Sequence, residues 1–251
     1  MRACEKNWVR LPLSGANNVR ELGGYPVGGG GQTAYHRFLR SDGLSMLTNK
    51  DVEFLRGYGL STVIDLRDMH EVKRAPNVDL GHGVVTHHIP LLGVNLADSE
   101  EIKRHLGGEE LDMRGLYFLM LENRDGVRAS FEAIAGAAEG CVLFHCAVGK
   151  DRTGMLALLL LSLAGVDRFD IISNYMQSRI HLMRDEAYAA DWADPNKVMF
   201  HSALDSPPEM AEYVLDLIES EHGGIVRYLM ECGVGDATID AVYARLVGET
   251  S

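Results

Sequence analysis

One loop constrains the fold of this chain more than any other stretch. It lies between the apolar runs 141–144 and 155–166 and reads His145-Cys146-Ala147-Val148-Gly149-Lys150-Asp151-Arg152-Thr153-Gly154. The first run is short and follows a glycine, which is typical of a buried strand, whereas the second is too long and too rich in Leu and Ala to be one. The order strand, loop, helix places the loop at the N-terminal end of a helix.

Such a helix end is suited to binding an anion. The first backbone N–H groups of a helix have no partner within it, and the helix dipole adds about half a positive charge there. The N–H groups of residues 147–152 can therefore surround one tetrahedral dianion, while the guanidinium of Arg152 binds two of its oxygens. The same field favours the thiolate form of Cys146, which then lies in line to attack a bound phosphoryl group.

Three further motifs accompany the loop along the chain. They are Asn17–Tyr25, Leu39–Asp42, and Ile64–Arg67 followed by Glu71. Together with the loop, which has the spacing Cys-x5-Arg, they resemble the bacterial and fungal tyrosine phosphatase-like family of the protein tyrosine phosphatase superfamily. Val19 and Glu21 stand where that family usually has Phe and Asp, which affects the packing of the N-terminal arm rather than the chemistry.

The resemblance implies an enzyme that hydrolyses phosphomonoesters through a phosphocysteine intermediate. It would be a tyrosine phosphatase or a dual-specificity protein phosphatase, with phosphoinositides as a further class of substrate. Cys146 is the predicted nucleophile, Arg152 the predicted phosphate ligand, and Asp151 the acid that protonates the leaving oxygen. Further phosphate-binding residues are predicted to be Ala147, Val148, Gly149, Lys150 and Thr153. By the same resemblance, the Thr153 hydroxyl is expected to bond to the sulfur.

Several assignments remain open from the sequence. Asp68 and the acids of range 98–112 are alternatives to Asp151 as the acid, and Asp151 could instead orient Arg152 or cap the helix. Lys150 is either a second cation that favours polyanionic head groups or a solvated surface lysine. A phosphate-binding pseudo-phosphatase would need a defect that the loop does not show. A cysteine-loop sulfurtransferase is disfavoured, because its loops usually place one residue fewer between cysteine and arginine.

Charge and composition exclude several other classes. A formal net charge of −12 opposes binding to nucleic acid or to anionic lipid surfaces, so an anionic substrate needs a local positive pocket. A nucleotide-binding P-loop is excluded, because Phe144 stands where its first glycine should be. Neither a secretory signal nor a membrane-spanning run is expected, which favours the cytoplasm and leaves export without a cleaved signal open. The oligomeric state is open as well.

The cysteines and histidines do not indicate a metal or disulfide site. The four cysteines have no Cys-x-x-Cys spacing, and Cys141 is expected to be a buried apolar residue. Neighbouring histidines on a strand, such as His87 and His88, point to opposite faces and cannot easily share one ion. No metal and no cofactor are therefore expected.

The remaining pattern predicts one α/β domain over residues 1–251. Its central sheet is mainly parallel and flanked by helices, with an added C-terminal helical layer. Strands are expected near 34–40, 60–66, 84–89 and 141–145. Helices are expected at 49–56, 128–138, 155–166, 168–184, 209–220, 224–232 and 237–246, with one or two more within 98–121. Residues 28–31 form a hairpin turn, and 186–208 is either a lid or a loop-helix insert. Arg67 and Glu71 are expected to form a structural ion pair rather than to contact the substrate.

Overall fold

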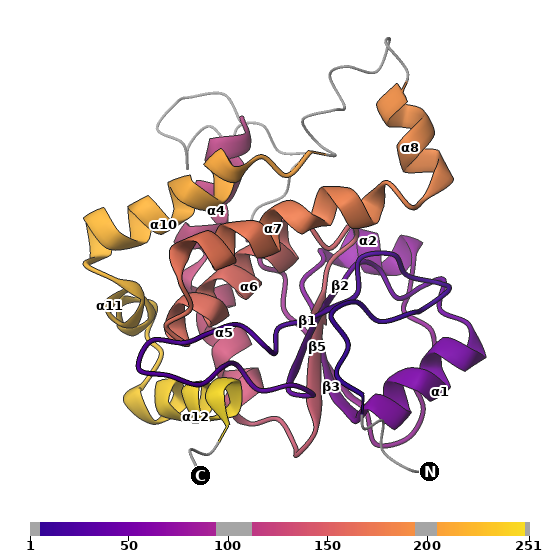
Figure 1. The fold of residues 1–251 in the computed structure, drawn as a ribbon, viewed down its shortest axis with the longest axis horizontal. Helices are drawn as coiled ribbons and strands as arrows, with labels where there is room; N and C mark the ends of the chain where they lie inside the picture. The colour runs from indigo at the N-terminus through magenta and orange to yellow at the C-terminus, as the bar shows by residue number, and fades with distance from the viewer. Residues whose placement is uncertain (1–5, 94–111, 194–204, 249–251) are drawn as a thin grey trace.

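A five-stranded sheet forms the centre of the computed structural model, which describes residues 6–93, 112–193 and 205–248 (Figure 1). The strand order is β1-β2-β5-β3-β4, with β1 antiparallel to β2 and the other neighbours parallel. The strands are β1 (Arg20–Glu21), β2 (Phe38–Ser41), β3 (Leu60–Asp65), β4 (Val85–His88) and β5 (Cys141–His145). This confirms the predicted mainly parallel sheet.

Apolar residues cover both faces of the central strands. Along β5, Val142 and Phe144 belong to the larger apolar cluster, whereas Cys141 and Leu143 belong to a smaller one. Successive strand residues point to opposite faces, so each cluster lies on its own side of the sheet. The predicted burial of Cys141 is confirmed.

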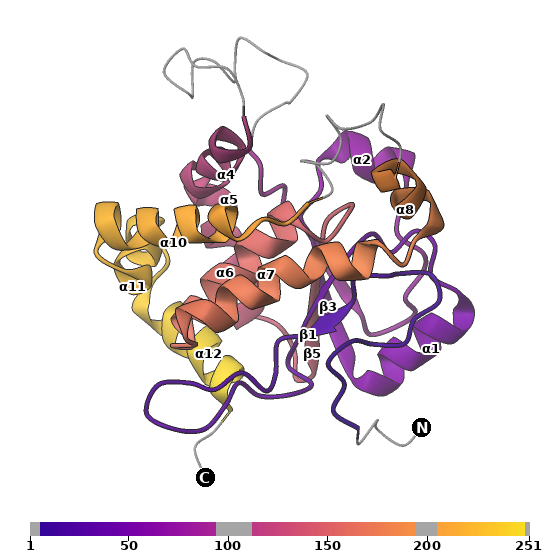
Figure 2. The same cartoon turned by 45° about the horizontal axis from the view of Figure 1, so that its top comes forward.

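Helices surround the sheet, with α1 on one side and α5, α6 and α12 on the other (Figures 1 and 2). The helices are α1 (Asn49–Tyr58), α2 (Met69–Arg74), α4 (Met113–Glu122), α5 (Arg124–Ala135), α6 (Asp151–Leu163), α7 (Arg168–Leu182), α8 (Glu186–Ala193), α10 (Pro208–His222), α11 (Ile225–Glu231) and α12 (Asp236–Val247). Within the described residues, none has the length and apolarity needed to cross a membrane.

The strand register brings the distant motifs together. Ser41 of β2 and Asp65 of β3 both pair with His145, the last residue of β5. The carboxyl ends of three parallel strands therefore reach one edge of the sheet, which is where open α/β sheets bind their ligands. As a result, the motifs at 39–42 and 64–67 flank the loop that follows β5.

Local signals account for most element boundaries. Thr48 and Asp51 form a capping box at the start of α1, and Gly59, in the left-handed conformation, ends it. The turn at residues 28–31 is confirmed by a bridge between Pro26 and Gln32. Strand β1 and helix α2 were not predicted, and α5 begins four residues before its predicted start. Both unpredicted elements are short, so periodicity carries little signal for them.

Candidate active site

The loop after β5 positions Cys146 beneath the first turn of α6. The sulfur accepts a hydrogen bond from the backbone N–H of Gly149 at 3.3 Å, and Cys146 is only 2% exposed. Gly149 has a φ of +73°, and a Cβ there would lie 2.6 Å from the backbone nitrogen of Asp42. Only glycine allows this close approach of the loop to the end of β2.

Side chains from the N-terminal half hold the loop carbonyls away from the sulfur. The Asn18 amide donates to the carbonyls of Val148 and Gly149, at 3.1 Å each, and the Arg40 guanidinium donates to Gly149 at 2.8 Å. In a trans peptide, C=O and N–H point in opposite directions. Binding the Val148 carbonyl on the outside therefore turns the Gly149 N–H toward Cys146.

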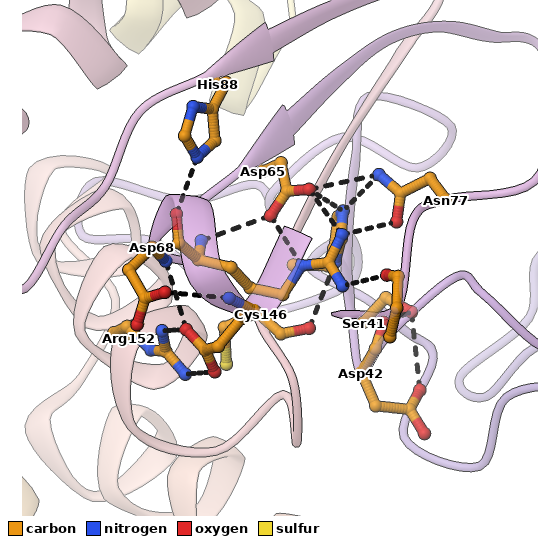
Figure 3. A network of polar contacts seen from close by, with 12 residues as sticks. Ser41, Asp42, Asp65, Asp68, Asn77, His88, Cys146 and Arg152 are labelled. Carbon is orange, nitrogen blue, oxygen red and sulfur yellow. Dashed lines mark hydrogen bonds and ion pairs between the residues drawn. The ribbon is translucent and has the colours of Figure 1, made fainter. Parts of the chain in front are cut away.

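Arg152, in the first turn of α6, is held by a carboxylate on α2. Two of its nitrogens contact the two carboxylate oxygens of Glu71, one of them at 2.8 Å (Figure 3). Glu71 also accepts from the backbone N–H of Asp68 at 3.0 Å, which completes a capping box at the start of α2. Burial acts against the charge of Arg152, but the pair with Glu71 raises the pKa of Arg152 overall, so it stays a cation.

His145 is a neutral, buried part of the same edge. Asn77 links it to Asp65. The Asn77 amide lies 3.2 Å from Asp65 (Figure 3) and 3.1 Å from Nε2 of His145. Burial lowers the pKa of His145 to about 4. Nε2 then accepts from Asn77, and Nδ1 donates to the carbonyl of Cys146 at 3.1 Å. This fixes the backbone at the start of the loop.

Asp151 and Lys150 continue the loop into α6. Oδ1 of Asp151 accepts from the Tyr117 hydroxyl at 2.7 Å and lies 3.4 Å from the ammonium of Lys150. That ammonium also donates to the backbone carbonyl of Asp205 at 2.9 Å, and Lys150 is fully buried. Asp151 keeps a quarter of its side chain exposed.

This arrangement of a buried cysteine, the turned-in N–H group of Gly149 and a fixed arginine suits a phosphoryl group. A model of the tyrosine phosphatase family matches residues 11–248. The chain belongs to that family. It is thus a cysteine-based protein-tyrosine phosphatase, as the loop and its three accompanying motifs predicted.

Individual relatives have moderate sequence identity. A tyrosine-protein phosphatase of Nostoc commune is 29% identical over 83% of this chain and 74% of its own length. The triple specificity protein phosphatase PtpB of Mycobacterium tuberculosis is 28% identical over 84% and 91%. The crystal structure of P. aeruginosa TpbA in complex with pTyr covers 80% of this chain and 90% of its own at 17% identity. Its TM-score of 0.33 is too low to support any argument.

Two predicted side-chain contacts in this phosphatase site need correction, and one of the two alternatives for Lys150 is excluded. Arg67 does not pair with Glu71: it forms a buried ion pair with Asp65 at 2.6 Å, which leaves Glu71 for Arg152. Lys150 is not a solvated surface lysine, because its ammonium is buried against backbone and carboxylate oxygens. The Thr153 hydroxyl donates to the Ser41 carbonyl at 3.3 Å rather than to the sulfur.

The alternative acids have structural roles or fall outside the described residues. Asp68 and Asp112 accept from backbone N–H groups at the starts of α2 and α4. Residues 98–111 lie outside the described ranges, and so do 194–204 of the predicted lid or insert. Helix α8 occupies the start of that segment and α10 begins at its end. Among the described residues, no group of three histidine, cysteine or acidic side chains could hold a metal ion.

Sequence reasoning missed Asn77 and Tyr117, which support the loop from a distance, and it missed the role of Asn18 within the motif at 17–25. Asn18, Asn77 and Tyr117 come from three separate parts of the chain and meet the site only through tertiary packing. The sequence did contain one signal for this part of the site. Asp68 and Glu71 have the spacing of a capping box, which predicts a helix start at α2 and the orientation of Glu71.

The pair of Glu71 with Arg152 also predicts how stability depends on pH. Despite partial burial, Arg152 lowers the pKa of Glu71 to about 2, from 4.5 for the exposed group. The stabilisation is therefore present above pH 4.5 and is lost as pH falls from there toward 2. We expect Glu71→Gln to lower the free energy of unfolding at pH 7 by about 1 kcal/mol, since the pair is partly exposed. Urea unfolding should show this difference shrinking within that window; a difference that stays constant with pH would contradict it.

Proposed function

We propose that this phosphatase acts through a phosphocysteine formed on Cys146. In the first step the thiolate attacks phosphorus, the bond to the leaving oxygen breaks, and that oxygen takes a proton from Asp151. In the second step water attacks phosphorus, the S–P bond breaks, and Asp151 takes the proton from water. Arg152 and the loop N–H groups stabilise the equatorial oxygens in both steps.

The observation that carries this proposal is the shape of the loop around the sulfur. The N–H of Gly149 faces Sγ, and the pair with Glu71 fixes the guanidinium of Arg152 beside the same loop. The side chain of Lys150 makes no capping bond at the start of α6, so the helix N–H groups stay available to an anion. These features favour a dianionic phosphoryl group above the sulfur.

For the substrate, we propose phosphotyrosine proteins first and phosphoserine or phosphothreonine proteins second. The name of PtpB, a triple specificity phosphatase, supports such breadth in a related chain. Phosphoinositides are the third proposed class, since the buried charge of Lys150 adds to the positive field of the loop. We further propose that residues 1–251 act as one phosphatase domain, in keeping with the family match over 11–248.

The direct test is to trap the intermediate on the intact protein. The chain would be mixed with a phosphotyrosine peptide, a phosphoserine peptide or a short-chain phosphoinositide, without added metal, and quenched in acid within milliseconds. We expect phosphate release and a transient mass increase of one phosphoryl group on the tryptic peptide that contains Cys146. The preferred ester identifies the substrate class.

Three outcomes would contradict the proposal. Turnover without any phosphoryl group on Cys146, even at the shortest quench times, would favour direct attack by water. Release of phosphate from none of the three esters would favour a phosphate-binding pseudo-phosphatase. Turnover of thiosulfate with cyanide would instead indicate the sulfurtransferase that the loop spacing disfavours.

A further inference from the structure

Two tyrosines form a chain of hydrogen bonds that ends on Asp151. The Tyr117 hydroxyl, from α4, lies 2.7 Å from Oδ1 of Asp151 and 2.7 Å from the hydroxyl of Tyr175, from α7. The two rings meet edge to face, with centroids 6.1 Å apart. Both residues are buried to 1% exposure, so water does not compete for these bonds.

The direction of these bonds follows from the chemistry of the groups. Burial raises the pKa of both phenols well above their usual range, so each keeps its proton near neutral pH. The bonded oxygen of Asp151 accepts, so Tyr117 uses its only proton toward Asp151. Tyr175 must then donate to the oxygen of Tyr117. The chain therefore runs from Tyr175 through Tyr117 to Asp151.

Within the described ranges, the two donors that contact the Asp151 side chain lie on the same oxygen. Besides the Tyr117 hydroxyl, the Lys150 ammonium lies 3.4 Å from Oδ1, and the Asp205 carbonyl holds that ammonium at 2.9 Å. An oxygen that faces two donors is a poor place for an acidic proton. When Asp151 is protonated, its proton is therefore expected on Oδ2.

The packing around the loop after β5 leaves room for this chain of hydrogen bonds. Gly154, in the first turn of α6, would place a Cβ 3.1 Å from the ring of Tyr175. A side chain at this position would push the ring away from α6 and separate its hydroxyl from Tyr117. Gly154 thus lets α7 bring Tyr175 close to the helix that carries Asp151.

We propose that Tyr117, supported by Tyr175, is a positioning residue that turns Oδ1 of Asp151 inward and leaves Oδ2 to exchange the proton. Oδ2 gives its proton to the leaving oxygen as the P–O bond breaks, and it takes one from water as the S–P bond breaks. The proposal rests on the proposed function, in which Asp151 is the acid.

The test compares esters whose leaving groups differ in their need for a proton. The leaving group of a phosphotyrosine peptide is a tyrosine phenolate, which is a poor leaving group unless it is protonated. The leaving group of 4-nitrophenyl phosphate is much better, so its cleavage depends less on the acid. We expect Tyr117→Phe to lower kcat about 10-fold on the peptide and less than about 2-fold on 4-nitrophenyl phosphate, with KM unchanged. Tyr175→Phe should show the same pattern with a smaller loss.

The matched control is Tyr228→Phe. Tyr228 is also fully buried, and its hydroxyl donates to the carbonyl of Leu121, on the same helix as Tyr117, at 2.8 Å. This variant removes a buried hydroxyl that supports α4 but does not touch Asp151. It should lower stability without changing the ratio of the two rates, which separates a general loosening of α4 from an effect on the acid.

Asp151→Asn distinguishes failure of this proposal from failure of the proposed function. We expect it to reduce turnover of the peptide about 100-fold, with a smaller effect on 4-nitrophenyl phosphate, and adding Tyr117→Phe should change nothing more. Equal losses on both esters in Tyr117→Phe, or additive losses in the double variant, would overturn the positioning role alone. An Asp151→Asn variant without leaving-group dependence would overturn the assignment of the acid and this proposal with it.

Discussion

Replacing Cys146 by serine is expected to lower kcat on a phosphotyrosine peptide by about 10⁴-fold or more. A serine hydroxyl is far less acidic than a thiol, so the helix end and the nearby cations cannot ionise it near neutral pH. The oxygen would lie where the sulfur lies, 3.3 Å from the Gly149 N–H, but as a neutral hydroxyl it would be a far weaker nucleophile than a thiolate. Initial rates of phosphate release measure the loss.

Binding should survive the same change. Arg152, its partner Glu71 and the loop N–H groups are untouched in Cys146→Ser, so inorganic phosphate should bind as it does to the parent protein. Calorimetry with phosphate would then show that the site is intact while turnover is lost. Retention of the parent rate would mean that another group is the nucleophile.

Cys141→Ser is the matched control for this variant. The same exchange is made on strand β5, five residues earlier, where burial raises the pKa of the Cys141 thiol well above its usual range. That thiol stays protonated and takes no part in the proposed reaction. We expect phosphatase activity close to that of the parent protein, with at most a loss of stability from placing a hydroxyl in the core.

The strand, loop and helix of the site could be predicted because their signals are local. Apolar runs of different lengths distinguish β5 from α6, and the cysteine and arginine between them are adjacent in the chain. Two of the three other motifs lie at the ends of β2 and β3. The pairing of Ser41 and Asp65 with His145 places these motifs beside the loop.

Partners that meet only through packing could not be predicted. The pairing of Glu71 with Arg152 depends on how a six-residue helix lies against α6. By its position in the sequence, Arg67 was an equally plausible partner for Glu71. The ammonium of the buried Lys150 donates to the carbonyl of Asp205, which lies 55 residues further along the chain. Sequence patterns report which face of an element is apolar, but not which polar groups two elements bring together.

Arg152→Lys is expected to lower kcat/KM on the phosphotyrosine peptide by about 10³-fold although it keeps the charge. A guanidinium has five N–H donors in a fixed plane. Glu71 takes two of them from one side, which leaves others for two oxygens of the phosphoryl group. A lysine ammonium cannot bind the carboxylate and two phosphoryl oxygens with the same geometry.

Arg37→Lys is the matched control, because Arg37 pairs with an almost fully exposed Glu139 far from the loop. The kcat/KM of this variant should equal that of the parent protein. The inhibition constant for inorganic phosphate would show how much of the Arg152→Lys loss arises in binding. If Arg152 acts mainly as the charge redistributes, kcat must fall more than phosphate affinity does. An Arg152→Lys variant with nearly the parent kcat/KM would mean that net charge alone serves the reaction, and that the orientation imposed by Glu71 contributes only to folding.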